Sequence, residues 1–477
     1  MGFFNWFKKP KKDYEATQSE SYNDDGWIYN NQNTSPMDGE VFNLSYRTES
    51  LLKNDPNTEK GLRVIENNVV GNGITPQAVS RSNNSELVRR VEAAIIAYFD
   101  SKECDASQVT NFYGMQNLAL REMVKNGNCF IRRRPRSFSQ GLTVPMQYQV
   151  LSYDYLATDM LDTTNGNNRI INGIEYNRLF QPVAYHFYKE NPRDYSQYWT
   201  ARGREIVRVR ASSVYHLYRR DQVDQRIGIS WFTPVLPTLR MLANYRNNVL
   251  TKQQIQSSIT AFITTDEDGD VNKLLGKRKS DGKTQIKRGQ LNRLRPGEDV
   301  KFPDMPDISG DTEFYKQFRF DIANALGISY EELSGDYSNV NFSSGRMGWI
   351  AMSRNIQSIQ QNIFGAQFLK GVGEDFLNNL VLQGDINAAE RADVYIKWVY
   401  PRRVMLDPVK ETNAILSQIS GKIKSRKQAI EEMGYDYFSV MEEIAFDRDT
   451  QNSLGISDEQ ATSQENSQEN SEDEEEL

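Results

Sequence analysis

The chain has 477 residues, of which 38% are hydrophobic and 25% charged. This length allows roughly two to four globular units, and the low apolar content favours an elongated or ring-forming subunit over one compact enzyme. The formal net charge of -7 is misleading, because residues 457–477 hold nine acids and no base, which leaves 57 basic against 55 acidic residues elsewhere.

No run approaches the roughly 18 apolar residues that a membrane helix needs, so no membrane partner is expected. Two cysteines, Cys104 and Cys129, are too few for a disulfide framework or a zinc site. They are interpreted as buried thiols in a reducing compartment.

The two ends of the chain, residues 1–42 and 450–477, are polar and lack helical periodicity, so both are predicted to be flexible. The first strong helix is predicted over 56–70, capped by Asp55 and ended by a glycine. A second is predicted over 85–99, where apolar residues recur on one face.

Short alternating runs separated by Gly, Asn and Pro indicate a β-rich domain over 129–218. A long, polar helix is predicted over 237–258, an irregular basic region follows to residue 308, and another helix is predicted over 311–326. The polar helix has one apolar stripe and is otherwise hydrophilic, as expected if it packs on a single neighbour.

A polar loop follows Gly327, and a long helix is predicted to start near Ser344 and run to about Leu382. The apolar stripe of that helix moves to a neighbouring face midway, which predicts two packing partners, and Gly371 and Gly373 are predicted to allow a bend there. Small helices are predicted after Asp407. The loop combines aromatic and short polar side chains and is interpreted as a contact surface, with these candidate residues: Tyr337, Ser338, Asn339, Asn341, Phe342 and Ser343.

Catalytic chemistry is not indicated. The segment Gly276–Thr284 (GKRKSDGKT) has five rather than four residues between its glycines and no preceding buried strand, so a phosphate-binding loop is rejected in favour of a solvated basic loop. The two histidines, His186 and His216, lie in apolar strand patterns typical of buried imidazoles. No metal site and no cofactor is predicted.

Basic residues concentrate between residues 273 and 295, where nine bases face only Asp281. This patch suits phosphate contacts or an acidic partner, and a plain solvated surface is the alternative. A second group, Arg132–Arg136, is interpreted as an exposed strand end. The candidate docking residues of the larger patch are Lys277, Arg278, Lys279, Lys283, Lys287, Arg288, Arg293 and Arg295.

The segment Leu326–Arg346 (LGISYEELSGDYSNVNFSSGR) resembles the lambda-type portal proteins of tailed bacteriophages. Further matches occur in family order, and together they cover roughly residues 45–447. These matches are Asn67–Ile74, Leu118–Val124, Gly173–Tyr188, His216–Tyr218, Gly228–Leu236, Pro296–Phe302, Asp407–Glu411 and Lys424–Gly434.

The resemblance implies an α+β portal fold that assembles into a ring. Its parts map as a flexible arm (1–42), a wing of helices and a β-rich region (43–236), a stem helix (237–259), a clip (260–308), a second stem helix (309–327), a tunnel loop (328–343), a long wing helix and return strand (344–400), crown helices (401–449) and an acidic tail (450–477).

The implied function is a non-enzymatic ring, a dodecamer in the virion, at one capsid vertex. Double-stranded DNA would pass through it during packaging and ejection. The implied partners are the large terminase, head-completion or adaptor proteins and the major capsid protein, with assembly in the host cytoplasm. The basic patch is expected to dock proteins, and the tunnel loop is expected to line the channel or, alternatively, to pack between subunits. The alternatives to the portal function are a motor or nuclease subunit and a nonspecific DNA-binding component.

Overall fold

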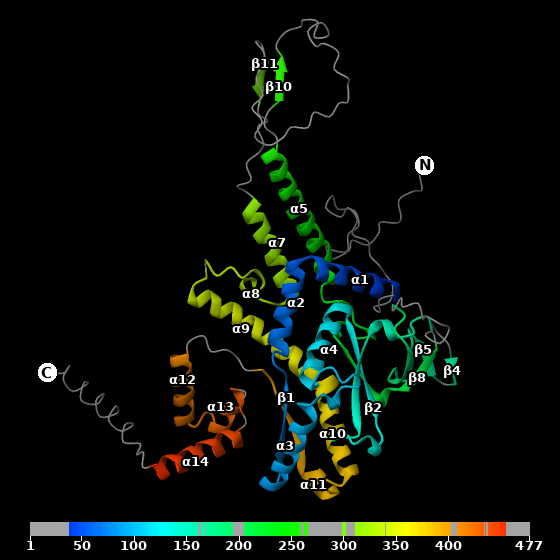
Figure 1. Ribbon diagram of the computed structural model, residues 1–477, viewed down its shortest axis with the longest axis vertical. Coiled ribbons are helices and arrows are strands. Elements are labelled where there is room, and N and C mark those ends of the chain that lie inside the picture. Colours follow the sequence, from blue (N-terminus) through cyan, green and yellow to red (C-terminus); the bar gives the residue numbers. More distant parts are fainter. Residues whose placement is uncertain are drawn as a thin grey trace, which may run out of the picture.

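The computed structural model describes residues 38–160, 164–166, 168–193, 205–258, 262–265, 298–301, 311–338, 340–401, 408–433, 435 and 437–454. Its fold class is α+β, as predicted. Helices and sheets form a main body, two helices project from it toward a distant hairpin, and three further helices lie beside it (Figure 1).

The first helices of the body confirm two predictions. They are α1 (Asp38–Asn54), α2 (Pro56–Val69), α3 (Ser85–Phe99) and α4 (Phe112–Asn126). The Asp55 side chain caps α2 by accepting from the Thr58 amide at 2.9 Å, and Pro56 occupies the first helical position. In α3, the apolar residues of the predicted stripe are buried.

Helix α1 was not predicted, and it moves the end of the expected flexible arm from residue 42 to before Asp38. Its buried face includes Val41, Ser45 and Thr48, so two small polar residues interrupt the apolar pattern. The Ser45 hydroxyl donates to Asn126 Oδ1, and the hydroxyls of Thr48 and Ser230 lie 2.9 Å apart. The helix is held by specific hydrogen bonds that hydrophobic periodicity does not reveal.

The predicted β-rich region is confirmed as two antiparallel sheets. One has the order β3-β2-β9, with β2 at Asn128–Pro135, β3 at Met146–Ser152 and β9 at Val214–Tyr218. The other has five strands in sequence order: β4 (Thr164–Asn165), β5 (Asn168–Ile171), β6 (Ile174–Tyr176), β7 (Pro182–Tyr188) and β8 (Ile206–Arg210). Phe130 joins them, because its ring lies 5.3 Å from Phe187.

A separate two-stranded sheet ties the beginning of the chain to its last third. Strand β1 (Thr75–Ser80) pairs antiparallel with β12 (Val394–Val399), the predicted return strand. Short helix α11 (Ala388–Asp393) leads into β12, and the Asp393 carboxylate accepts from the amide and hydroxyl of Ser82. The pairing closes the body around its main core.

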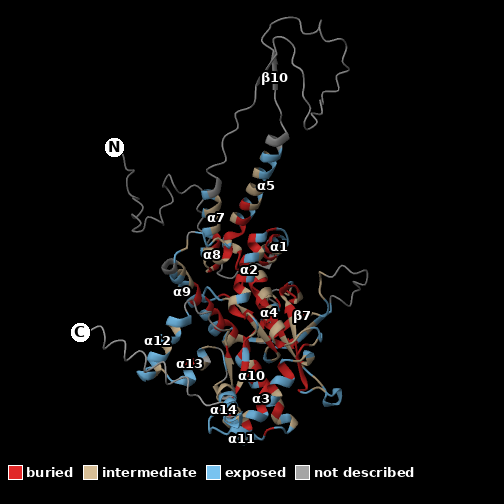
Figure 2. Ribbon diagram, turned by 60° about the vertical axis from the view of Figure 1, so that its left-hand side comes forward, coloured by how far each residue is buried: buried red, intermediate tan, exposed pale blue. Residues whose placement is uncertain are grey.

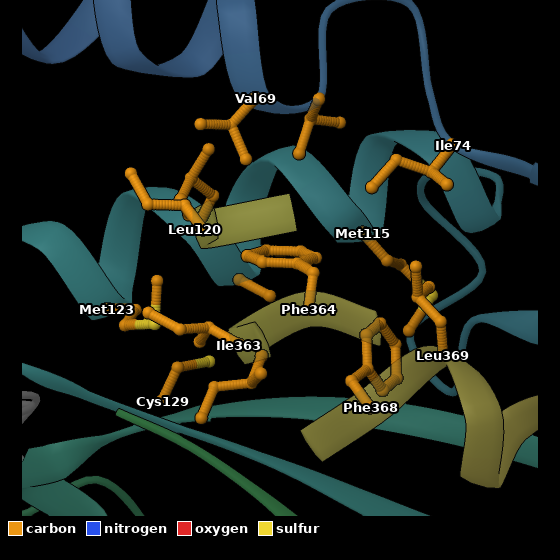
Figure 3. Close-up of a cluster of buried hydrophobic side chains, with 14 of the residues drawn as sticks. Val69, Ile74, Met115, Leu120, Met123, Cys129, Ile363, Phe364, Phe368 and Leu369 are labelled. Carbon is orange, nitrogen blue, oxygen red and sulfur yellow. The ribbon is translucent and has the colours of Figure 1, made fainter. Parts of the chain in front are cut away.

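The long helix after the loop consists of α9 (Phe342–Ser358), a π-helical segment (Ile359–Leu369) and α10 (Lys370–Gln383). The π-helical winding lies where the apolar stripe changes face. Gln360 bonds to the Val69 carbonyl of α2, whereas Gln367 bonds to Tyr218 of β9, which confirms two packing partners. Figure 3 shows Phe364 and Phe368 directed into the core beside α4.

The two glycines of this helix allow close packing. A β-carbon at Gly371 would lie 2.3 Å from Cε1 of Tyr215, and one at Gly373 would lie 3.1 Å from Cβ of Ile396. A side chain at Gly371 would force Tyr215 of β9 to move, and one at Gly373 would need a smaller shift of Ile396 on β12. Close approach explains these positions, and the bend predicted here stays a prediction.

The projecting helices are α5 (Leu236–Ser258) and α7 (Asp311–Leu326), whose bounds agree with the prediction within one residue. At their far end, β10 (Phe262–Thr265) pairs antiparallel with β11 (Glu298–Lys301) (Figure 1). The Tyr245 and Phe314 rings, 5.7 Å apart, join the two helices.

Three small helices beside the body confirm the predicted helices after Asp407: α12 (Pro408–Ser420), α13 (Arg426–Glu432) and α14 (Tyr437–Leu454). Ser425 caps α13 by accepting from the Gln428 amide at 3.0 Å. Helix α14 extends to Leu454, so the acidic tail expected from residue 450 begins five residues later. Figure 2 shows these helices as largely exposed, in contrast to the buried centre of the body.

Candidate functional site

The loop predicted as a contact surface begins at the end of α7, where the chain turns. Gly327 adopts φ +68°, a conformation that residues with side chains rarely take, and its amide donates to the Asn324 carbonyl at 3.1 Å. The Asn355 side chain of α9 donates to the Gly327 carbonyl at 3.1 Å. The end of α7 is therefore attached directly to α9.

The predicted loop, residues 328–343, is shorter than expected because it contains helix α8 (Tyr330–Ser334) and because α9 begins at Phe342. Ser329 caps α8 by accepting from the Glu332 amide at 3.2 Å. A serine followed three residues later by a glutamate signals a helix start, and this signal could have revealed α8. The connecting segment is Gly335–Asn341, called the channel loop after its predicted role.

Helix α8 fixes the base of the channel loop to the body. The Tyr330 ring stacks on Phe320 of α7 at 4.1 Å, with 17° between the ring planes. Leu333 is only 3% exposed, and a β-carbon at Gly61 of α2 would lie 3.6 Å from its Cδ1. The loop is therefore anchored where α7, α8 and α2 pack against one another.

The channel loop has internal order. The Asp336 carboxylate accepts from the Ser338 amide at 3.1 Å and from the Ser338 hydroxyl at 2.6 Å. These hydrogen bonds from Ser338 lower the pKa of Asp336, which is therefore ionised at neutral pH. The Val340 amide donates to the Tyr337 carbonyl at 3.2 Å. This arrangement is an Asx turn that leads into a second tight turn.

Exposure of the loop agrees with a contact surface for the described side chains. Tyr337 is 59% exposed, and Ser338 and Asn341 are also exposed. Asn339 and the side chains of Phe342 and Ser343 lie outside the described part, although Phe342 and Ser343 belong to the first turn of α9. Their predicted role in lining a channel stays a prediction.

The second predicted site, the basic patch, lies outside the described residues. The stretch 266–297 contains all eight of its candidates: Lys277, Arg278, Lys279, Lys283, Lys287, Arg288, Arg293 and Arg295. Only the paired strands β10 and β11, which flank that stretch, are described.

Groups of possible chemical interest elsewhere have structural roles. Burial raises the pKa of the Cys104 thiol to about 12 and raises that of Cys129 as well, and both thiols are free. Burial lowers the pKa of His216 to about 3, and its Nε2 lies 3.1 Å from Asn128 Oδ1. Within the described ranges, no cluster of His, Cys, Asp and Glu is suited to hold a metal.

The arginine group on β2 does not form an exposed strand end as expected. Arg133 forms an ion pair with Asp375 of α10, which also accepts from the Tyr215 hydroxyl. Arg134 donates to Gln149 on the neighbouring strand. Because these side chains are half-buried, they join the sheet to the long helix.

No described helix combines the length and the apolar character that crossing a bilayer requires.

Comparisons with known proteins agree with the resemblance noted in the sequence. Residues 25–360 match the family described as phage portal protein, lambda family. The chain is 23% identical over 437 residues to the probable portal protein of Halomonas phage phiHAP-1, covering 88% of this chain and 82% of that protein. It is 19% identical over 436 residues to portal protein B of Escherichia phage lambda, covering 83% and 81%.

Among solved structures, the chain is similar to one from the neck of a native gene transfer agent particle. The TM-score is 0.46 at 13% identity, over 81% of this chain and 93% of that one. This TM-score is low, so the assignment rests on the sequence matches. The family match spans well over half of the chain. The chain therefore belongs to the lambda family of phage portal proteins, which are structural, non-enzymatic components of phage capsids.

Proposed function

We propose that copies of this chain close into a ring, a dodecamer, at one vertex of a phage capsid, and that double-stranded DNA passes through the ring during packaging and ejection. The observation that carries the proposal is the lambda-family match over residues 25–360. The proposal assigns the chain to the virion, with assembly in the host cytoplasm.

Exposed apolar side chains on the projecting helices support association of copies. Met241 and Leu250 of α5 are 59% and 51% exposed, and Phe314 and Phe320 of α7 are 53% and 42% exposed. Apolar groups gathered on one part of a surface mark an interaction site. Neighbouring copies that pack along α5 and α7 would cover them and form the stem of the ring.

The channel loop has the chemistry that passage of DNA of any sequence requires. Such a channel needs weak phosphate contacts and no base reading, because tight binding would stall movement. From Gly335 to Ser343 the only charged residue is Asp336, whose ionised carboxylate repels phosphate. The short polar side chains offer transient hydrogen bonds. The proposed lining residues are Tyr337, Ser338, Asn339, Asn341, Phe342 and Ser343.

The remaining parts follow from this assignment. The body is the wing, α5 and α7 are the stem, the β10–β11 region is the clip, and α12–α14 form the crown. The clip, with its basic patch, is the proposed docking site for the large terminase and later for head-completion or adaptor proteins. The major capsid protein is the proposed partner of the ring at the vertex.

Negative-stain microscopy of the purified full chain tests the ring, and closed rings are expected. A strictly monomeric protein under assembly conditions would refute the proposal, and salt-dependent DNA binding by such a monomer would favour the DNA-binding alternative. Sustained ATP hydrolysis by the purified chain would favour the motor alternative.

The loop is tested by a chain that carries Tyr337→Ala and Asn341→Ala and keeps Asp336 and the capping glycine. Phe138→Ala, in an exposed turn of the wing, is the matched control because Phe138 is 63% exposed. All variants are expected to form rings, and only the loop variant is expected to change DNA packaging or retention in complementation assays. Unchanged packaging and retention in the loop variant would remove the role of the loop.

A further inference from the structure

Helix α12 has an apolar seam that the described part of the chain does not bury. None of its residues is buried, although its apolar side chains are not scattered. Val409 and Leu416 are 70% and 56% exposed and lie seven residues apart, with Thr412 and Ile419 on the same face, and Ile423, 82% exposed, lies in the turn that follows the helix. A spacing of three and four along one face is the pattern by which a helix packs on another helix.

Helix α14 exposes a complementary feature. Phe446 is 73% exposed, and its neighbours one turn away on the helix surface are Glu442, Glu443 and Asp449. An apolar ring surrounded by carboxylates requires a partner that offers both an apolar groove and positive charge. Glu442 already forms a 2.6 Å ion pair with Arg89 of the wing, but both side chains are more than 60% exposed.

The seam of α12 offers such a surface. Lys410 lies beside Val409, and Lys422 precedes Ile423, so positive charge lies at both ends of the seam, whereas Lys424 is already paired with Glu432 of α13. Residues 408–433 carry five basic and three acidic side chains, whereas 437–454 carry one basic and four acidic ones. The segment that contains α12 and α13 is therefore net basic, and α14 is net acidic.

We infer that the α12 seam of one copy receives Phe446 of α14 from the next copy, so that the three-helix units interlock head to tail. The inference rests on the proposed ring and names a partner surface within it. A ring formed by rotation needs two different, complementary surfaces on each copy, which α12 and α14 provide. The acids around Phe446 then face the lysines at the ends of the seam.

Engineered cysteines test this contact in the full chain. A chain with both Leu416→Cys and Phe446→Cys is expected to give a ladder of covalent multimers under mild oxidation, whereas each single variant stays monomeric on a denaturing gel. The native thiols contribute no background, because both are buried with raised pKa values. A double variant with Leu382→Cys, at a 72% exposed position on α10, in place of Leu416→Cys is the matched control.

The outcomes separate this inference from the proposed function. Rings in negative stain together with a ladder from the Leu416–Phe446 pair alone support it. Rings without that ladder overturn the contact but leave the ring proposal intact, and this result is also expected if another segment or protein covers the seam. Multimers from Phe446→Cys alone would show like surfaces meeting and overturn it. An absence of rings overturns both.

Discussion

The junction between α7 and the channel loop should be unusually sensitive to one methyl group at Gly327. Gly327 and Gly335 have nearly equal positive φ values, +68° and +69°, so Gly327→Ala and Gly335→Ala pay the same backbone cost of about 1–2 kcal/mol. Their surroundings differ. A β-carbon at Gly327 would lie 2.3 Å from Nδ2 of Asn355, whereas nothing lies within 4 Å of one at Gly335.

The difference between the two variants therefore isolates the contact with Asn355. To accommodate the methyl group, this exposed side chain must give up its 3.1 Å hydrogen bond to the Gly327 carbonyl, at a cost of about 0.5–1.5 kcal/mol. Gly327→Ala should raise the local opening constant roughly 2- to 12-fold more than Gly335→Ala does. Hydrogen exchange of amides in α7 and α8, followed by mass spectrometry, measures this constant.

A double-mutant cycle completes the test. In an Asn355→Ala background both the clash and the hydrogen bond are absent, so Gly327→Ala should cost only as much as Gly335→Ala. Equal effects of the two alanines in the wild-type background would refute the reasoning. The reasoning would also be refuted if Gly327→Ala were as destabilising in the Asn355→Ala background as in the wild-type chain.

Three further predictions concern the main body. The folded-state pKa of His216, about 3, lies below its ordinary value of 6.5, so the stability that the neutral imidazole contributes is present above pH 6.5 and is lost as the pH falls toward 3. His216→Phe should therefore flatten the dependence of thermal stability on pH between 6.5 and 4.5, and NMR should show a neutral imidazole at pH 5. Burial raises the pKa of Glu49, but hydrogen bonds from Lys53 and Arg193 outweigh burial and hold the pKa at about 2. The stability that the ionised Glu49 contributes above pH 4.5 is therefore lost as the pH falls toward 2, and Glu49→Gln should reduce that loss by about 1 kcal/mol in acid unfolding. Phe364→Ala, at a position with no exposed surface, should cost about 3–5 kcal/mol in urea denaturation, and a loss below about 1 kcal/mol would contradict its place in the core.

Local signals in the sequence were sufficient for elements that carry their own caps and stripes. Asp55 and Pro56 mark the start of α2, and the bounds of α3 and α7 follow from apolar spacing and end signals. The β-rich region was recognisable from alternation and turns. The pairing of β1 with β12 was not predictable, because it joins segments more than 300 residues apart through ladder hydrogen bonds that leave no local pattern.

For the channel loop too, some features could be predicted from the sequence and others could not. Its position, its exposed Tyr337 and its polar composition could be read from the residues, but its length could not, because α8 is a single turn stabilised by the Ser329 cap and by stacking of Tyr330 on Phe320. The resemblance to portals supplied the family, and the physical pattern alone indicated only a contact surface. The basic patch lies outside the described residues and stays a prediction.

Two features that hydrophobic period does not reveal share one physical cause, the burial of polar side chains at contacts between elements. Ser45 and Thr48 bury one face of α1 through hydrogen bonds, and Gln360 fills a core position by donating to the α2 carbonyl of Val69. A buried polar group is stable only when it is satisfied, so each such residue specifies one partner rather than a general apolar environment. A method that reads hydrophobic period treats these positions as exposed. The exposed seam of α12 is the converse case, in which a strong apolar period predicts burial that one copy of the chain does not supply, and this excess is what directs attention to a second copy.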